Sequence, residues 1–152
     1  MRTFKSMDEF REYANKISWK YKFSISKYNE DYSIDVNTDV HIVYVKYLKY
    51  LPIKFNIALG DFNCANNDLI SLEGCPKYVG GDFYCFKNQL TSLDGAPKYI
   101  GGNFGCYCYG GNQFTSLKGA PEVIRGQWVI EEEYRKFPEY QRYLLVKKIE
   151  DL

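Results

Sequence analysis

The sequence contains one histidine, almost no net charge and no long apolar stretch, and these scarcities exclude several classes of protein. Twenty basic and 19 acidic residues leave a net charge of +1, which argues against a broad electrostatic nucleic-acid binder and against an acidic DNA mimic. No apolar run reaches the ~18 residues that a membrane-spanning helix needs. Asp8 and Glu9 stand where a secretion signal would carry its apolar stretch, so we expect a cytoplasmic protein without membrane contact.

Glycine and cysteine are missing from both ends of the chain. All 12 glycines and all five cysteines lie between Gly60 and Gly126. The odd number of cysteines favours reduced thiols over a secreted disulfide framework. The shift in composition divides the chain into a middle segment with one kind of backbone and two flanks with another.

The middle segment is an internal repeat. The motif Gly-Asp/Asn-Phe-x-Cys occurs three times in steps of 21 residues, and a Ser-Leu-x-Gly-x-Pro motif follows each copy. The third copy carries three extra residues within 107–111, and a degenerate copy precedes the first. The first motif occupies 60–64, 81–85 and 102–106, and the second occupies 71–76, 92–97 and 116–121.

The period and spacing predict a short α+β solenoid of the leucine-rich-repeat type, with ~21-residue coils stacked through a parallel sheet. The pattern L-x-L-x-x-N-x-L-x-x-L is matched by Phe62, Cys64, Asn67, Leu69 and Leu72. Alternation along the strand predicts that Phe62 and Cys64 point inward. Asn63 and Ala65 are then expected to point outward.

The repeat resembles bacterial-type leucine-rich repeats, and more closely a leucine-rich-repeat-like family common in tailed bacteriophages. The unit of that family reads GGDF-x-C-x-x-N-x-LTSLEGAPK-x-VGG, and the resemblance covers roughly residues 32–130. It implies a scaffold protein whose setting is the cytoplasm of a phage-infected bacterium.

The flanks carry signals for caps on the two ends of the solenoid. Ser6 and Glu9 form a capping box that predicts a helix, and alternating segments from Tyr21 and Tyr32 predict a hairpin. Pro138 predicts the start of a closing helix. We expect one folded domain, with a helix and hairpin cap over 1–38, the solenoid over 39–130 and a capping helix over 131–152. The alternative for the hairpin is a dedicated binding surface.

The cysteines and asparagines that recur within the repeat have a structural interpretation. Cys64, Cys85 and Cys106 share one repeat position, and with coils ~4.8 Å apart the outer two lie too far apart for one metal ion. We therefore expect a buried row of thiols and no metal or cofactor; Cys108, in the insertion, is the candidate reactive thiol. The repeated asparagines at Asn67, Asn88 and Asn112 are expected to satisfy backbone groups inside the turns.

The outward side chains of the parallel sheet are the candidate partner-binding site. Tyr84, Phe86 and Tyr107 are aromatic side chains on neighbouring coils that core packing does not require. The alternative is that the insertion folds back and covers them. Tyr78 and Tyr99 are expected to pack between coils, whereas Tyr44, Tyr47 and Tyr50 have no predicted side. The complete candidate site comprises His41, Asn63, Tyr84, Phe86, Tyr107 and Tyr109.

These features favour a non-enzymatic protein-binding module, encoded by a phage and inhibiting a bacterial host protein such as a defence nuclease. Direct nucleic-acid contact is not expected. A different class of function is a sponge that sequesters a nucleotide-like signal by aromatic stacking and a lysine such as Lys87. A third is an enzyme that uses His41, for which no cysteine with an orienting third group is evident.

Overall fold

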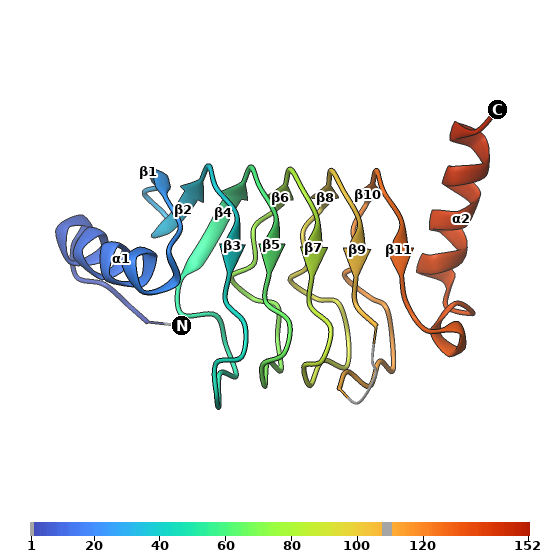
Figure 1. Cartoon of the computed structure of the whole chain (residues 1–152), viewed down its shortest axis with the longest axis horizontal. Coiled ribbons are helices and arrows are strands. Elements are labelled where there is room, and N and C mark those ends of the chain that lie inside the picture. The colour runs from blue at the N-terminus through green and yellow to red at the C-terminus, as the bar shows by residue number, and fades with distance from the viewer. Residues whose placement is uncertain (1, 108–110) are drawn as a thin grey trace.

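The computed structural model describes residues 2–107 and 111–152. The chain forms an elongated stack of coils with one helix at each end (Figure 1). The expected α+β solenoid with helical caps is therefore confirmed. Each complete coil contributes one short strand to each of two sheets, so the stack carries two walls of parallel strands.

The five-stranded sheet is the parallel sheet that the repeat predicts. Consecutive strands pair in parallel, and Phe62, Phe83 and Phe104 lie in register on neighbouring strands. In chain order the strands are β3 (Val40–His41), β5 (Phe62–Asn63), β7 (Phe83–Tyr84), β9 (Phe104–Gly105) and β11 (Trp128–Val129).

The six-stranded sheet was not predicted. Its strands β4 (Lys54–Ala58), β6 (Tyr78–Val79), β8 (Tyr99–Ile100) and β10 (Val123–Ile124) follow one another in parallel. The hairpin strands β1 (Ile25–Tyr28) and β2 (Ser33–Val36) extend it, because β2 pairs in antiparallel with β1 and in parallel with β4.

The two residues of a strand in this sheet point to opposite sides, which corrects the expectation for Tyr78 and Tyr99. Val79 is fully buried, and Tyr78 is 38% exposed. The rings of Tyr78 and Tyr99 stack on each other outside the sheet at 4.7 Å between centroids. They do not pack between coils, because the neighbouring valine and isoleucine fill the interior.

The core is a row of aromatic rings that runs along the axis of the stack. The ring centroids of Phe62 and Phe83 lie 6.1 Å apart, those of Phe83 and Phe104 5.6 Å, and Trp128 continues the row at 5.3 Å from Phe104. Burial of each phenylalanine contributes about 1.5–3 kcal/mol. Glycine is required at Gly95, which has φ +91° and where an added Cβ would lie 2.7 Å from the backbone of Leu72 in the preceding coil.

The N-terminal cap begins as the capping box predicts. In α1 (Met7–Tyr21) the Ser6 hydroxyl accepts a hydrogen bond from the Glu9 N–H, and Phe10 and Ala14 are fully buried. The helix continues through Tyr21, where the sequence pattern predicts the first hairpin strand. Lys22 ends the helix in the left-handed conformation, and its N–H bonds the carbonyl of Ser18, so the strand starts only at Ile25.

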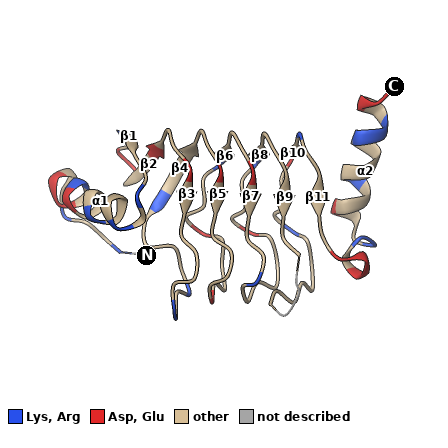
Figure 2. Ribbon diagram, viewed as in Figure 1, with Lys and Arg blue, Asp and Glu red and all other residues tan. Residues whose placement is uncertain are grey.

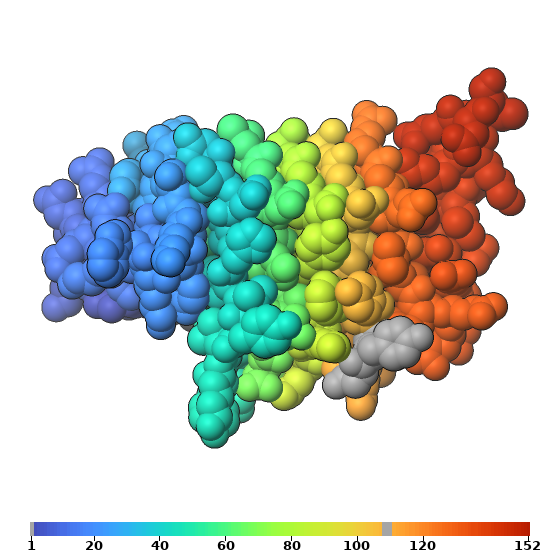
Figure 3. All heavy atoms as spheres, in the orientation of Figure 1, coloured from blue at the N-terminus to red at the C-terminus, as the bar shows by residue number. Residues whose placement is uncertain are grey.

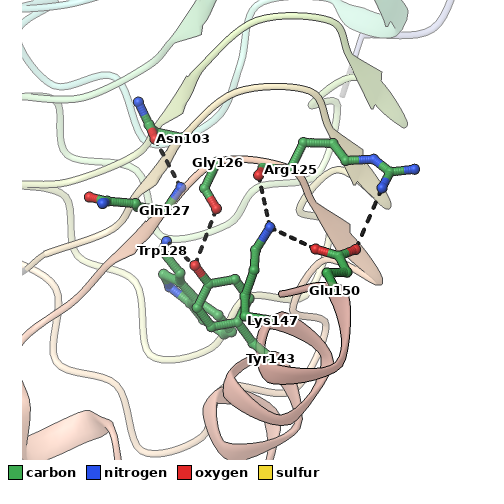
Figure 4. Close-up of polar contacts among 8 residues, drawn as sticks. All are labelled: Asn103, Arg125, Gly126, Gln127, Trp128, Tyr143, Lys147 and Glu150. Atoms are coloured by element: carbon green, nitrogen blue, oxygen red, sulfur yellow. Dashed lines mark hydrogen bonds and ion pairs between the residues drawn. The ribbon is translucent and has the colours of Figure 1, made fainter. Parts of the chain in front are cut away.

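The C-terminal helix supplies the hydrogen bonds that a further coil would have made. After a short 3-10 turn, η1 (Glu132–Tyr134), the helix α2 (Pro138–Glu150) begins at the predicted proline. The Tyr143 hydroxyl accepts from the N–H of Trp128 (3.0 Å) and donates to the carbonyl of Gly126 (3.2 Å), as Figure 4 shows. Lys147 donates to the carbonyl of Arg125 at 2.8 Å.

Candidate partner-binding face

The candidate site lies on the outer face of the five-stranded sheet. The parallel register places residues of successive coils side by side, so one position of the repeat becomes a row across the face. The row through the strands contains His41, Asn63, Tyr84, Gly105 and Val129. We call the row that precedes the strands the ladder; it contains Asp39, Asp61, Asp82, Asn103 and Gln127.

The first four side chains of the ladder each accept a hydrogen bond from the backbone of the next coil. Oδ1 of Asp61 accepts from the N–H of Asp82 at 2.7 Å, and Oδ1 of Asp82 accepts from the N–H of Asn103 at 2.6 Å. Asp39 and Asn103 make the same contact with their own next coils, at 2.8 and 2.9 Å. Three carboxylates are thereby fixed along one edge of the face. Figure 2 shows acidic residues at the beginning of β3, β5 and β7.

The ladder orients the first aromatic residue of the face. The Tyr84 hydroxyl donates a 2.7 Å hydrogen bond to Oδ2 of Asp82, and this bond is the main reason that the pKa of Tyr84 rises to about 12. The ring lies over Gly105, where an added Cβ would be 2.6 Å from Cδ1 of Tyr84. The half-buried Tyr84 is therefore held by a glycine beneath it and a carboxylate beside it.

Phe86 and Tyr107 complete a cluster of three partly exposed rings. Their rings stack with centroids 4.4 Å apart and an interplanar angle of 11°. Tyr84 meets Phe86 edge to face at 6.0 Å. The structure thus brings together the three aromatic residues that the sequence singles out, as one ordered apolar patch. Tyr109 and Cys108 lie outside the described residues.

Of the other predicted site residues, Asn63 lies on the strand next to Tyr84 and His41 lies one strand further away. His41 is exposed on β3, and its strand partner Asn63 is partly buried. Oδ1 of Asn63 accepts from the N–H of Ala65 at 3.0 Å. Ala65 was predicted to point outward into solvent, but this small residue has no exposed surface.

A shallow depression continues the face toward the C-terminal cap. It places two acidic side chains and one basic side chain next to the aromatic patch. Its lining comprises Tyr107, Val129, Ile130, Glu131, Glu132 and Arg135. The face therefore presents an apolar centre between the ladder carboxylates on one side and glutamates at one end.

The cysteines of the repeat lie on the opposite side of the sheet, in the core. Cys64, Cys85 and Cys106 have no exposed surface, which confirms the buried row of thiols. The indole N–H of Trp128 donates to Sγ of Cys106 at 3.1 Å, and burial raises the pKa of Cys75. His41 faces solvent, whereas the described thiols lie in the core on the other side of the five-stranded sheet. The described thiols and this imidazole therefore form no nucleophile–base pair.

The repeated asparagines are structural, as predicted. Oδ1 of Asn88 accepts from the N–H of Leu69 at 3.0 Å, and its amide donates to the carbonyls of Cys64 and Cys85. Asn67 and Asn112 occupy the same place in the neighbouring coils. Each amide therefore joins two coils and takes no part in the candidate site.

Comparison with family models, with curated proteins and with solved structures gives no match to this chain. Over the described parts of the chain, neither helix has the length and apolar character required to cross a bilayer. A function must therefore be inferred from the chemistry of the face itself.

Proposed function

We propose that the protein is a non-enzymatic module that binds a partner protein on the outer face of the five-stranded sheet. The observation that carries this proposal is the cluster of Tyr84, Phe86 and Tyr107, whose rings contact one another while remaining partly exposed. Rigid aromatic side chains at the centre of a face bury much apolar area at little cost in conformational entropy. Their fixed positions further reduce the cost of association.

Charge around the cluster indicates the kind of partner surface. The ladder carboxylates lie along one edge, and Glu131 and Glu132 lie at one end. A complementary surface carries lysine or arginine around an apolar centre. Nucleases bind the phosphates of their substrates with such cations. Together with the resemblance to phage repeat proteins, this supports an inhibitor of a host nuclease acting in the bacterial cytoplasm.

The geometry supports a nucleotide sponge less well. Phe86 and Tyr107 already stack on each other at 4.4 Å, so there is no slot between them for a base. The nearby carboxylates of Asp61 and Asp82 would repel a phosphate group.

The test is affinity capture from a bacterial host lysate followed by mass spectrometry, with Tyr84→Ala and Tyr107→Ala combined in one variant. We expect the variant to lose the captured protein while keeping the wild-type circular dichroism spectrum. The matched control is Tyr78→Ala with Tyr99→Ala, which removes two stacked tyrosines from the other sheet. Capture that survives the first variant, or is lost equally in the control, overturns the proposed face.

A further inference from the structure

The loop after β3 carries three exposed tyrosines. It spans residues 44–50 in the degenerate first repeat and extends beyond the loops of neighbouring coils (Figures 1 and 3). Tyr44 is 79% exposed, Tyr47 74% and Tyr50 52%. Val45 and Leu48, in contrast, pack against the core. The loop therefore directs its aliphatic residues inward and its tyrosines into solvent.

The backbone of this loop is fixed by hydrogen bonds to the next coil. The N–H of Tyr44 bonds the carbonyl of Asn66 at 3.0 Å, and the N–H of Tyr47 bonds the carboxylate of Asp68 at 3.1 Å. Tyr44 and Tyr47 both have positive φ, at 56° and 63°. Bulky residues rarely adopt this conformation, which carries an energetic cost. The tyrosines are thus held in place on an ordered backbone.

Two exposed lysines alternate with the tyrosines. The ammonium group of Lys46 lies 4.8 Å from the ring centroid of Tyr47. Among the ion pairs of the described residues, none involves Lys46 or Lys49. Lys87 occupies the turn position of Tyr44 two coils further along, where φ is also positive. Cations and aromatic faces therefore share this edge of the stack.

In the first coil of the five-stranded sheet, acidic and basic side chains lie at opposite ends of the strand, whereas in the next coil the carboxylate of Asp68 reaches the loop and accepts from the N–H of Tyr47. The aspartates of the ladder precede the strands, and the lysines of the loop follow them, as Figure 2 shows for the first coil. The net charge of +1 is the sum over all charged residues of the chain and does not describe this local arrangement. The expectation that the protein makes no nucleic-acid contact was based on that net charge and does not apply to the loop.

We propose that the 44–50 loop binds single-stranded nucleic acid, with bases stacked on Tyr44, Tyr47 and Tyr50 and phosphates paired with Lys46 and Lys49. Every base offers a π face to an exposed ring, and lysine neutralises the backbone. A duplex hides its base faces, so an unpaired strand is the form that fits. Insertion into a lipid surface is disfavoured because Val45 and Leu48 are held in the core.

The experiment measures the fluorescence anisotropy of a labelled oligothymidylate of about 20 nucleotides in about 50 mM salt. Tyr44→Asn combined with Tyr47→Asn should weaken binding at least about tenfold. Asparagine tolerates positive φ, so this variant loses the rings without added backbone strain. Tyr44→Phe with Tyr47→Phe keeps the rings and should bind as the wild type does. Tyr78→Asn, on the other sheet, is the tyrosine control.

The lysines are tested by the salt dependence of the same binding. Lys46→Gln with Lys49→Gln should reduce the slope of log K against log salt by about 1.4, that is ~0.7 for each lysine. The matched control, Lys136→Gln with Lys148→Gln, changes the net charge equally at exposed positions near the other end and should leave the slope unchanged.

Three results would overturn the proposal: no binding of the oligonucleotide by the wild type, binding that the loop variants leave intact, or an unchanged salt slope. Sedimentation with vesicles of equal parts phosphatidylcholine and phosphatidylserine separates the lipid alternative. Vesicle binding that depends on the loop, without oligonucleotide binding, would identify a membrane contact instead.

Discussion

At the scale of single residues, Tyr84 shows how a carboxylate of the ladder also determines the properties of a side chain on the outer face of the five-stranded sheet. Its hydroxyl donates to Asp82, so ionisation of the phenol would place two negative oxygens 2.7 Å apart. The folded protein therefore holds the pKa of Tyr84 at about 12, above the ordinary value of 10.0.

The free energy of unfolding should depend on this hydrogen bond above pH 10. A raised folded-state pKa contributes stability that is complete below about pH 10 and is lost as the pH rises toward 12. Tyr84→Phe removes the contribution. Between about pH 10 and 12, the urea midpoint of the wild type should therefore fall more steeply than that of the variant. Equal pH dependence of the two proteins would contradict the strength assigned to this bond.

Among single residues, the candidate site was partly predictable. Tyr84, Phe86 and Tyr107 follow from period-2 alternation and the 21-residue step alone. The ladder was not foreseen, although Asp61 and Asp82 recur one period apart. An aspartate after glycine is also typical of a turn, and only the stacked coils show that its carboxylate reaches the next backbone.

At the scale of elements, α2 replaces a missing coil at the end of the five-stranded sheet. The Tyr143 hydroxyl serves both an N–H and a carbonyl of the last coil, and Lys147 serves another carbonyl. These contacts leave fewer unpaired backbone groups at an edge that could otherwise pair with another chain.

Removal of that hydroxyl should loosen the final coil. Tyr143→Phe leaves the N–H of Trp128 without its acceptor and should lower the free energy of unfolding by about 1–2 kcal/mol. Hydrogen exchange at the Trp128 amide should accelerate about tenfold. Tyr140→Phe is the control, because the Tyr140 ring packs on Trp128 at 5.3 Å whether or not the hydroxyl is present. Unchanged exchange at Trp128 in Tyr143→Phe would show that the helix does not protect this edge.

The helices and the five-stranded sheet were predictable, whereas the six-stranded sheet was not. Ser6, Glu9 and Pro138 are strong local signals for helix starts. The strands at Tyr78–Val79 and Tyr99–Ile100 are two residues long and follow a proline turn, so no alternation can be seen in either one. Only the parallel pairing of neighbouring coils establishes them as a sheet.

At the scale of the whole molecule, stability depends on contacts between adjacent coils. Phe83 illustrates this, because its ring contacts the ring before it and the ring after it along the core. A solenoid gains its stability from such nearest-neighbour interfaces.

Loss of this ring should destabilise the whole stack. Phe83→Ala should lower the free energy of unfolding by about 3–5 kcal/mol, measured by urea denaturation. The control Tyr78→Ala removes a partly exposed ring and should cost less than about 1 kcal/mol. A loss of less than about 1 kcal/mol for Phe83→Ala would show that the coils do not depend on this core row.

The ladder has a consequence for how such a chain can change its length. At the ladder position, the side chain of each coil accepts a hydrogen bond from the next coil, and its backbone N–H donates one to the coil before. Neighbouring coils are therefore joined by the same type of hydrogen bond. An in-frame exchange of one 21-residue unit between gene copies would lengthen or shorten the stack while every junction still finds its partner. The number of coils, and with it the width of the outer face of the five-stranded sheet, is thus independent of the two caps.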